Sequence, residues 1–128
     1  MKNTPETLTV AVVGSRTIVM STALERRLNE LQPAHVVSGG AAGADSQAAS
    51  WAMRNLVALT ELRPDYARHG AGATHVRNAA IVAAADLVLV VWDGWSKGTL
   101  SAARAAARLG KRCEWLEEPA PSAGPLLL

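Results

Sequence analysis

The segment Asp86–Trp92 constrains the fold of this chain more than any other part of the sequence. After its first residue it is an unbroken run of leucine, valine and tryptophan. A strand without polar alternation is typical of a parallel sheet that is covered by helices on both faces. An alanine-rich helical pattern precedes this segment, and a glycine-containing loop and a second alanine-rich pattern follow it. We therefore predict an α/β fold with this strand inside the sheet.

The rest of the sequence repeats the alternation of strand and helix. Further strands are expected at residues 8–14, 35–38, 57–62 and 112–116, helices at residues 22–31, 45–55, 74–84 and 98–109, and a loop at residues 63–73. Short parallel strands joined by crossover helices give a doubly wound sheet. We predict a single Rossmann-like three-layer α/β domain over residues 7–117, with a five-stranded, mostly parallel sheet of order 3-2-1-4-5. Residues 118–128, which are rich in proline, are expected to be a flexible tail.

The first helix and the tryptophans give more local predictions. Residues 22–25, Thr-Ala-Leu-Glu, match a capping box that would begin the first helix. The buried stripe of that helix is expected to consist of Met20, Leu24, Leu28 and Leu31. The tryptophans expected in the core are Trp51, Trp92 and Trp115, whereas Trp95 is expected at the surface.

Composition excludes several classes of protein. The 13 basic and 11 acidic residues give a net charge of +2, which is too small to indicate nucleic-acid binding by itself. The single cysteine, Cys113, excludes an internal disulfide and a multi-cysteine metal site, so no metal is expected. The first residues lack the apolar run of a signal peptide, and the longest apolar stretch is shorter than the roughly 20 residues that span a bilayer. We therefore expect a cytoplasmic protein without a membrane partner.

Glycines and polar residues gather where strands are predicted to end and helices to begin. In a doubly wound sheet, ligands bind at the switch point, here between the carboxyl ends of the first and fourth strands. Glycines let backbone N–H groups approach an anion there, and helix N-termini favour phosphate. The expected ligand-binding residues are Gly14, Ser15, Arg16, Ser38, Gly39, Gly40, Gly43, Asp45, Arg77, Asn78, Asp93, Gly94, Ser96, Lys97, Gly98 and Thr99. Their convergence predicts a phosphate-binding pocket for a nucleotide-type ligand, and no other cofactor is evident.

Some of these residues have more specific expected roles. Arg77 is placed in the first turn of a helix, where a cation opposes the helix dipole, so we expect a phosphate partner. Asp45 is suited to contact a ribose, although a position in the first turn of a helix accounts for an acidic residue without any ligand. Asp93 is either a plain Asp-Gly turn residue or a ligand-binding or catalytic group. Trp95 could stack on a base.

The same segments resemble a known family. Four motifs are similar to those of the SLOG superfamily, and most of all to its small YspA-type (cpYpsA-related) branch: Val13-Gly14-Ser15-Arg16, Ser38-Gly39-Gly40 with Gly43-Ala44-Asp45, Arg77-Asn78, and Trp92-Asp93-Gly94 with Ser96-Lys97-Gly98-Thr99. The resemblance runs from about Val10 to Lys111. It implies a Rossmann-like fold and a role in binding nucleotides or nucleotide-derived signals, sometimes linked to conflict between phage and bacterium. Relatives are often dimers or larger, so a homo-oligomer is expected.

The Lonely Guy phosphoribohydrolases, which release a base from a nucleoside monophosphate, give one alternative activity. They carry an arginine similar to Arg77 and a glycine loop whose end is similar to Gly98-Thr99. Their acidic positions fall here on Ser101 and Ala102, although cleavage of an N-glycosidic bond requires a carboxylate. The sequence therefore favours a sensor or binding module over a nucleotide N-glycosidase or transferase. The catalytic candidates for the second activity are Arg77, Asp93 and Asp45.

The DprA/Smf family of DNA-processing proteins, which bind single-stranded DNA, gives another alternative. Their Gly-Ser-Arg start, Ser-Gly-x-x-x-Gly-x-Asp turn and Arg-Asn helix start resemble this chain. Single-strand binding usually needs a basic groove with stacking aromatics, whereas the charges here are mixed and only Trp95 is expected to be exposed. A small-molecule nucleotide is therefore the favoured partner, and nucleic acid stays open as the weaker alternative.

Overall fold

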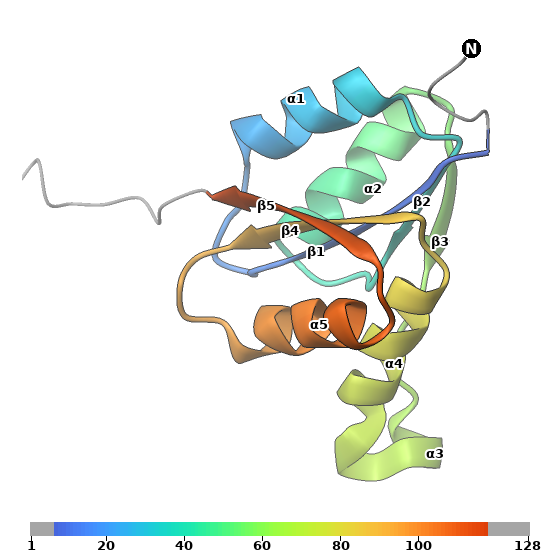
Figure 1. The fold of residues 1–128 in the computed structure, drawn as a ribbon, viewed down its shortest axis with the longest axis vertical. Helices are drawn as coiled ribbons and strands as arrows, with labels where there is room; N and C mark the ends of the chain where they lie inside the picture. The colour runs from blue at the N-terminus through green and yellow to red at the C-terminus, as the bar shows by residue number, and fades with distance from the viewer. Residues whose placement is uncertain (1–6, 118–128) are drawn as a thin grey trace, which may run out of the picture.

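The computed structural model describes residues 7–117, which form a five-stranded sheet with helices on both faces (Figure 1). The strands are β1 (Thr9–Gly14), β2 (His35–Ser38), β3 (Ala58–Glu61), β4 (Leu87–Trp92) and β5 (Arg112–Glu117). The helices are α1 (Thr22–Leu31), α2 (Ala44–Arg54), α3 (Tyr66–His69), α4 (Ala73–Ala83) and α5 (Lys97–Arg108), with a 3-10 turn, η1 (Gly70–Gly72), between α3 and α4.

The sheet has the predicted order, β3-β2-β1-β4-β5, and every pair of neighbouring strands is parallel. β1 and β4 lie side by side at the centre, with Gly14 opposite Val91. The chain leaves β1 toward β2 and leaves β4 toward β5, so the connections diverge between these two strands. This divergence is the switch point at which doubly wound folds bind ligands. The Rossmann-like α/β fold is confirmed.

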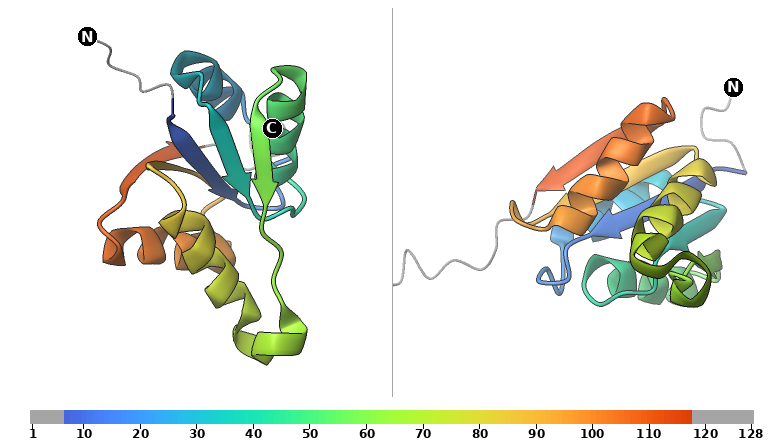
Figure 2. Two further views of the ribbon diagram at one scale, coloured as in Figure 1. Left: turned by 90° about the vertical axis from the view of Figure 1, so that its right-hand side faces the viewer. Right: turned by 90° about the horizontal axis from the view of Figure 1, so that it is seen from below.

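The sheet divides the core into two layers. Successive residues of a strand point to opposite faces, so Val10 and Val12 pack with α1 and α2, whereas Ala11 and Val13 pack with α4 and α5. The two helix pairs lie on opposite sides of the sheet in Figures 1 and 2. β4 contributes to both layers and is buried along its length except at Trp92, which explains its unbroken apolar sequence.

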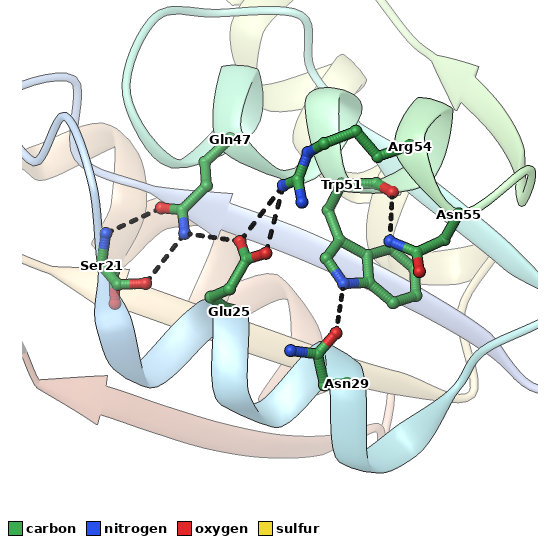
Figure 3. A network of polar contacts seen from close by, with 7 residues as sticks. All are labelled: Ser21, Glu25, Asn29, Gln47, Trp51, Arg54 and Asn55. Carbon is green, nitrogen blue, oxygen red and sulfur yellow. Dashed lines mark hydrogen bonds and ion pairs between the residues drawn. The ribbon is translucent and has the colours of Figure 1, made fainter.

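A polar network joins α1 to α2 above the first layer (Figure 3). The side chain of Gln47 accepts from the N–H of Ser21 and donates to the Ser21 carbonyl, each at 2.8 Å. Trp51, which is fully buried, donates its indole N–H to Asn29 at 2.8 Å. One side chain of α2 therefore hydrogen-bonds to both backbone groups of Ser21, the residue before α1.

The capping box predicted at residues 22–25 does not form. The N-cap of α1 is Ser21, whose hydroxyl accepts from the N–H of Leu24 at 3.0 Å. The N-cap therefore lies one residue before the predicted capping box, and Gln47, a residue of α2, holds Ser21 in place. This contact comes from tertiary structure, so the local pattern does not contain it.

Three further predictions outside the sheet differ from the structure. Residues 63–73 contain α3 and η1 instead of a plain loop, and α3 lies apart from the sheet (Figures 1 and 2). Met20 is exposed because it precedes the N-cap of α1. Trp115 is 46% exposed because it lies on the edge strand β5. The tail predicted at residues 118–128 lies outside the described residues.

Candidate functional site

A pocket of about 460 Å³ opens beyond the carboxyl ends of β1 and β4. It is lined by Val13, Gly14, Arg16, Thr17, Ala41, Asp45, Thr74, Arg77, Asn78, Ile81, Asp93, Trp95, Ser96, Gly98, Thr99 and Ala102. These residues come from the end of β1 and the loop after it, the β2–α2 connection and the start of α2, α4, the loop after β4, and the first turns of α5. The four segments that the sequence singles out therefore meet at one place. The volume is within the range of about 300–1,000 Å³ that is usual for small-molecule sites.

The pocket lining includes only part of the predicted set. The predicted residues outside the lining are Ser15, Ser38, Gly39, Gly40, Gly43, Gly94 and Lys97. Ser15 is buried, and its hydroxyl accepts from the N–H of Asp93 at 3.0 Å, so it fastens β1 to the loop after β4. Ser38 is also buried, and its hydroxyl has no hydrogen-bond partner within residues 7–117. Lys97 is exposed.

Three of the predicted glycines are needed for close packing. A Cβ atom on Gly14 would lie 2.4 Å from a side chain of α2, and one on Gly43 would lie 2.4 Å from a carbonyl of the β1–α1 loop. A Cβ atom on Gly39 would lie 2.6 Å from Nη1 of Arg77 and 2.9 Å from Oδ2 of Asp45. These glycines therefore let the strand ends, α2 and two charged side chains approach one another. They form the wall behind the pocket.

Asp93 organises the loop between β4 and α5. Its Oδ1 accepts from the N–H groups of Trp95 and Ser96 at 2.8 and 2.9 Å, and its Oδ2 accepts from the hydroxyl of Thr17 at 2.6 Å. The hydroxyl of Thr17 and these N–H groups lower the pKa of Asp93 to about 2. Asp93 is therefore an ionised carboxylate with both oxygens engaged, which makes it a weak proton acceptor.

The N-terminus of α5 presents free donors beyond Asp93. Ser96 is the N-cap, and its hydroxyl accepts from the N–H of Thr99. The N–H groups of Lys97 and Gly98 have no hydrogen-bond partner within residues 7–117. Apart from its chain neighbours and the backbone of α5 itself, no described atom lies within 4 Å of the position of a Cβ on Gly98, so a ligand can approach this backbone closely. Free N–H groups and the helix dipole together favour an anion here.

Arg77 is not in the first turn of its helix, so the helix-dipole argument for a phosphate partner is wrong. α4 begins at Ala73, which places Arg77 in the second turn. Its Nη1 donates to the carbonyls of Gly39 and Leu62 at 3.0 and 3.3 Å, and its Nε donates to Oδ1 of Asn78 at 2.9 Å. Only Nη2 keeps unpaired N–H groups within the described part of the chain. Arg77 therefore ties the ends of β2 and β3 to α4 and also lines the pocket.

Asp45 lies in the first turn of α2, as predicted, and is only 6% exposed. Its Oδ2 accepts from the N–H groups of Gly39 and Ala41 at 3.1 and 3.2 Å. Burial raises the pKa of Asp45 to about 6, against the opposing effects of these N–H groups and of the charge on Arg77. Asp45 is therefore a pocket carboxyl group that changes its charge close to neutral pH.

Several lining residues were absent from the predicted set. Val13, Ile81 and Ala102 supply the apolar part of the pocket and belong to the core layer under α4 and α5. Val13 could have been identified because it directly precedes Gly14 at the carboxyl end of the predicted strand. Thr17 pairs with a residue 76 positions away, and no local pattern indicates such a contact.

The pocket has an exposed rim and a lining that contains charged residues. Trp95 lies at the rim and is 84% exposed, and Arg16 is a second exposed residue of the lining. The charged lining residues are two arginines and two aspartates, so the pocket has a mixed charge. Within residues 7–117, no three His, Cys, Asp or Glu side chains are grouped as a metal site. None of the helices in the same range combines the length and apolarity needed to cross a membrane.

Comparison with known proteins gives one family match and similar solved structures. Residues 8–69 match the YspA, cpYpsA-related SLOG family, which confirms the resemblance for the first two of the four motifs; Arg77-Asn78 and the motif that begins at Trp92 lie outside the match. No curated protein matches the chain.

Two of the similar solved structures are of DNA processing protein A. The protein from Helicobacter pylori, described for its single-stranded DNA binding mode, has a TM-score of 0.67 and 24% identity, over 94% of this chain and 71% of that one. The protein from Streptococcus pneumoniae has a TM-score of 0.64 and 22% identity, over 85% of this chain and 50% of that one. At these identities the similarity shows a shared fold, and the present chain spans half the length of the second protein.

Proposed function

We propose that this chain, whose residues 8–69 match the YspA-type SLOG family, binds a nucleotide or a nucleotide-derived phosphorylated ligand as a sensor or binding module. The observation that carries the proposal is the N-terminus of α5 at the pocket. The N–H groups of Lys97 and Gly98 lack partners within residues 7–117, and Gly98 leaves the backbone open to a ligand. A phosphate group at this position would accept both hydrogen bonds.

The rest of the pocket supports a ligand that is more than a phosphate. Arg16 offers a guanidinium group without a hydrogen bond inside the described chain, and Trp95 offers an exposed aromatic face. A nucleotide combines an anionic group with a flat aromatic base, and both can be held by such side chains.

Isothermal titration calorimetry with nucleoside monophosphates, ADP-ribose and cyclic nucleotides tests the proposal. We expect at least one of them to bind, and Arg16→Ala to weaken binding about tenfold through loss of a charge-assisted contact. Arg104→Ala is the matched control, because Arg104 is exposed on α5 and lies outside the pocket lining. Absence of heat with every ligand, or equal losses in both variants, would contradict the proposal.

Cleavage of an N-glycosidic bond is a second candidate function, and Asp45 is the observation that favours it. The reaction needs a carboxyl group whose pKa is close to the working pH. Asp45 lines the pocket, and burial raises its pKa to about 6. Ser101, at one of the positions where the hydrolases carry an acid, pairs with His75 instead, at 2.9 Å. Incubation with nucleoside monophosphates should then release free base, and Asp45→Asn should stop the release. A flat time course for the unaltered protein excludes this activity.

Binding of single-stranded DNA is favoured by the similarity to DNA processing protein A and by the exposed Trp95 at the pocket rim. Fluorescence anisotropy with a labelled oligonucleotide across a range of salt concentrations tests it. Backbone contacts would make the affinity fall steeply with added salt. An affinity that does not change from low to moderate salt would contradict this candidate.

A further inference from the structure

Two of the most buried polar side chains in the pocket each keep one hydrogen-bonding group unused. Asp45 and Asn78 are 6% and 8% exposed, and both line the pocket. Oδ2 of Asp45 accepts two backbone N–H groups, whereas Oδ1 has no hydrogen bond within residues 7–117. Oδ1 of Asn78 accepts from Nε of Arg77, which can only donate, so the free group of Asn78 is its Nδ2 amide. The pocket therefore offers one free acceptor and one free donor from buried side chains.

A continuous frame of hydrogen bonds fixes these two side chains. The N–H of Gly39 donates to Asp45, and the carbonyl of the same residue accepts from Arg77, which in turn holds Asn78. Arg77 and Asp45 approach Gly39 so closely that a Cβ there would require one of these two side chains to move. Side chains held in this way bind a ligand with little further loss of conformational freedom.

We propose that Asp45 and Asn78 bind the sugar hydroxyl groups of the ligand, so that the pocket selects ribonucleotides over 2′-deoxyribonucleotides. This inference rests on the proposed nucleotide binding. A hydroxyl group both donates and accepts, so neighbouring ribose hydroxyls complement a carboxylate oxygen and an amide N–H. A phosphate beside Asp45 would be repelled by the ionised carboxylate, and the free N–H groups of Lys97 and Gly98 offer it a better place. Buried polar groups left without a partner strongly disfavour a ligand that lacks the hydroxyl.

Calorimetry with AMP, 2′-deoxy-AMP, ribose 5-phosphate and GMP tests this assignment on the full chain. We expect AMP to bind about 10- to 100-fold more tightly than 2′-deoxy-AMP, because a hydrogen bond to a charged group is lost. We also expect ribose 5-phosphate to bind without a base. Asp45→Asn should bring AMP and 2′-deoxy-AMP to within about threefold of each other by weakening AMP alone. Asp86→Asn is the matched control, because Asp86 also accepts a backbone N–H, from Thr9 at 2.9 Å, but lies outside the pocket lining.

A second variant guards against misfolding of Asp45→Asn. Asn78→Asp keeps an acceptor for Nε of Arg77 and removes the free amide donor, so it should also lose the preference for AMP. Equal affinity of the unaltered protein for AMP and 2′-deoxy-AMP would overturn the sugar assignment and leave nucleotide binding intact. GMP bound at least tenfold more tightly than AMP, with no effect of the 2′-hydroxyl, would place a base edge on these residues and also overturn it. Binding of none of the four ligands would remove the proposed function as well.

Discussion

At the scale of single residues, the two aspartates of the pocket differ in what surrounds them. Asp93 accepts from a hydroxyl and two backbone N–H groups, which lower its pKa to about 2. Asp45 is buried, and burial raises its pKa to about 6. In the sequence both are acidic residues next to a glycine-containing turn, so their roles could not be separated there. The pKa of Asp93 is lowered by the hydrogen bond from Thr17, whereas the pKa of Asp45 is raised because Asp45 is buried next to Gly39 and Arg77.

We predict that Asp45→Asn stabilises the protein above about pH 6 and has little effect near pH 4. The pKa of Asp45 is about 6 in the folded protein, against 3.8 as the ordinary value, so between these values the folded state holds a proton that the unfolded state has released. The stability due to this residue is therefore highest at low pH and is lost as the pH rises to about 6. Of its charged neighbours, Arg77 opposes the shift and Glu61 adds to it.

Thermal unfolding at about pH 4 and about pH 8 measures this effect. Because asparagine stays neutral, the Tm of the variant should exceed that of the unaltered protein by several degrees at the higher pH only. The same Tm difference at both pH values would contradict a raised pKa for Asp45.

A pair of glycine substitutions separates packing from access to the ligand. Gly39→Ala would place its Cβ 2.6 Å from Nη1 of Arg77, so we expect a loss of about 1–3 kcal/mol in the free energy of unfolding. Gly98→Ala meets open space in the first turn of α5, so it should leave stability unchanged or slightly higher. Urea unfolding compares the two variants. Equal stability of both would show that Gly39 is not packed as described.

At the scale of elements, the contact between α1 and α2 depends on one glutamine. Gln47→Ala would leave the buried N–H of Ser21 without a partner (Figure 3), at a cost of about 1–3 kcal/mol, whereas the Ser21 carbonyl would keep the hydrogen bond from the N–H of Glu25. Ser50→Ala, at an exposed position of the same helix, should change stability by less than about 0.5 kcal/mol. Denaturant unfolding gives both values, and a Gln47→Ala variant as stable as Ser50→Ala would contradict the account.

The loop between β4 and α5 should loosen without its carboxylate. Asp93→Ala removes the acceptor of the Trp95 and Ser96 N–H groups and of the Thr17 hydroxyl. Hydrogen exchange should therefore speed up for Trp95 and Ser96 and stay unchanged in α1, which is on the opposite face of the sheet. Unaltered protection of these two amides would show that the loop is held by other contacts.

The helices and strands could be predicted because their sequence signals are local. The predictions differ from the structure where a boundary depends on contacts between residues far apart in the sequence. The apolar run of β4 reports burial on both faces, and its prediction is confirmed. The start of α1 depends on Gln47, which is 26 residues from Ser21, and the local capping pattern therefore indicated the wrong cap. The sequence predicts that α4 begins one residue later than it does, so Arg77 is expected in the first turn of the helix although it lies in the second.

At the scale of the whole molecule, the strand order explains why four separate segments form one pocket. Because β1 and β4 are neighbours and the connections after them diverge, the ends of both strands remain uncovered at one edge of the sheet. Topology could be predicted from the alternation of strands and helices, and so could the position of the pocket. The sequence does not predict which residues of these segments line the pocket, because some of them, such as Ser15 and Gly43, pack the strand ends together instead.

The most direct test of nucleotide binding at this edge is a titration of the ¹⁵N-labelled protein with AMP, followed by two-dimensional NMR. If the ligand binds as proposed, the backbone amides of Gly98 and Thr99, the side-chain amide of Asn78 and the indole of Trp95 shift together in a saturable way. Amides of α1, on the other face of the sheet, should not move. No shift at millimolar AMP, or shifts that gather on α1 and leave Gly98 and Asn78 unchanged, would contradict it.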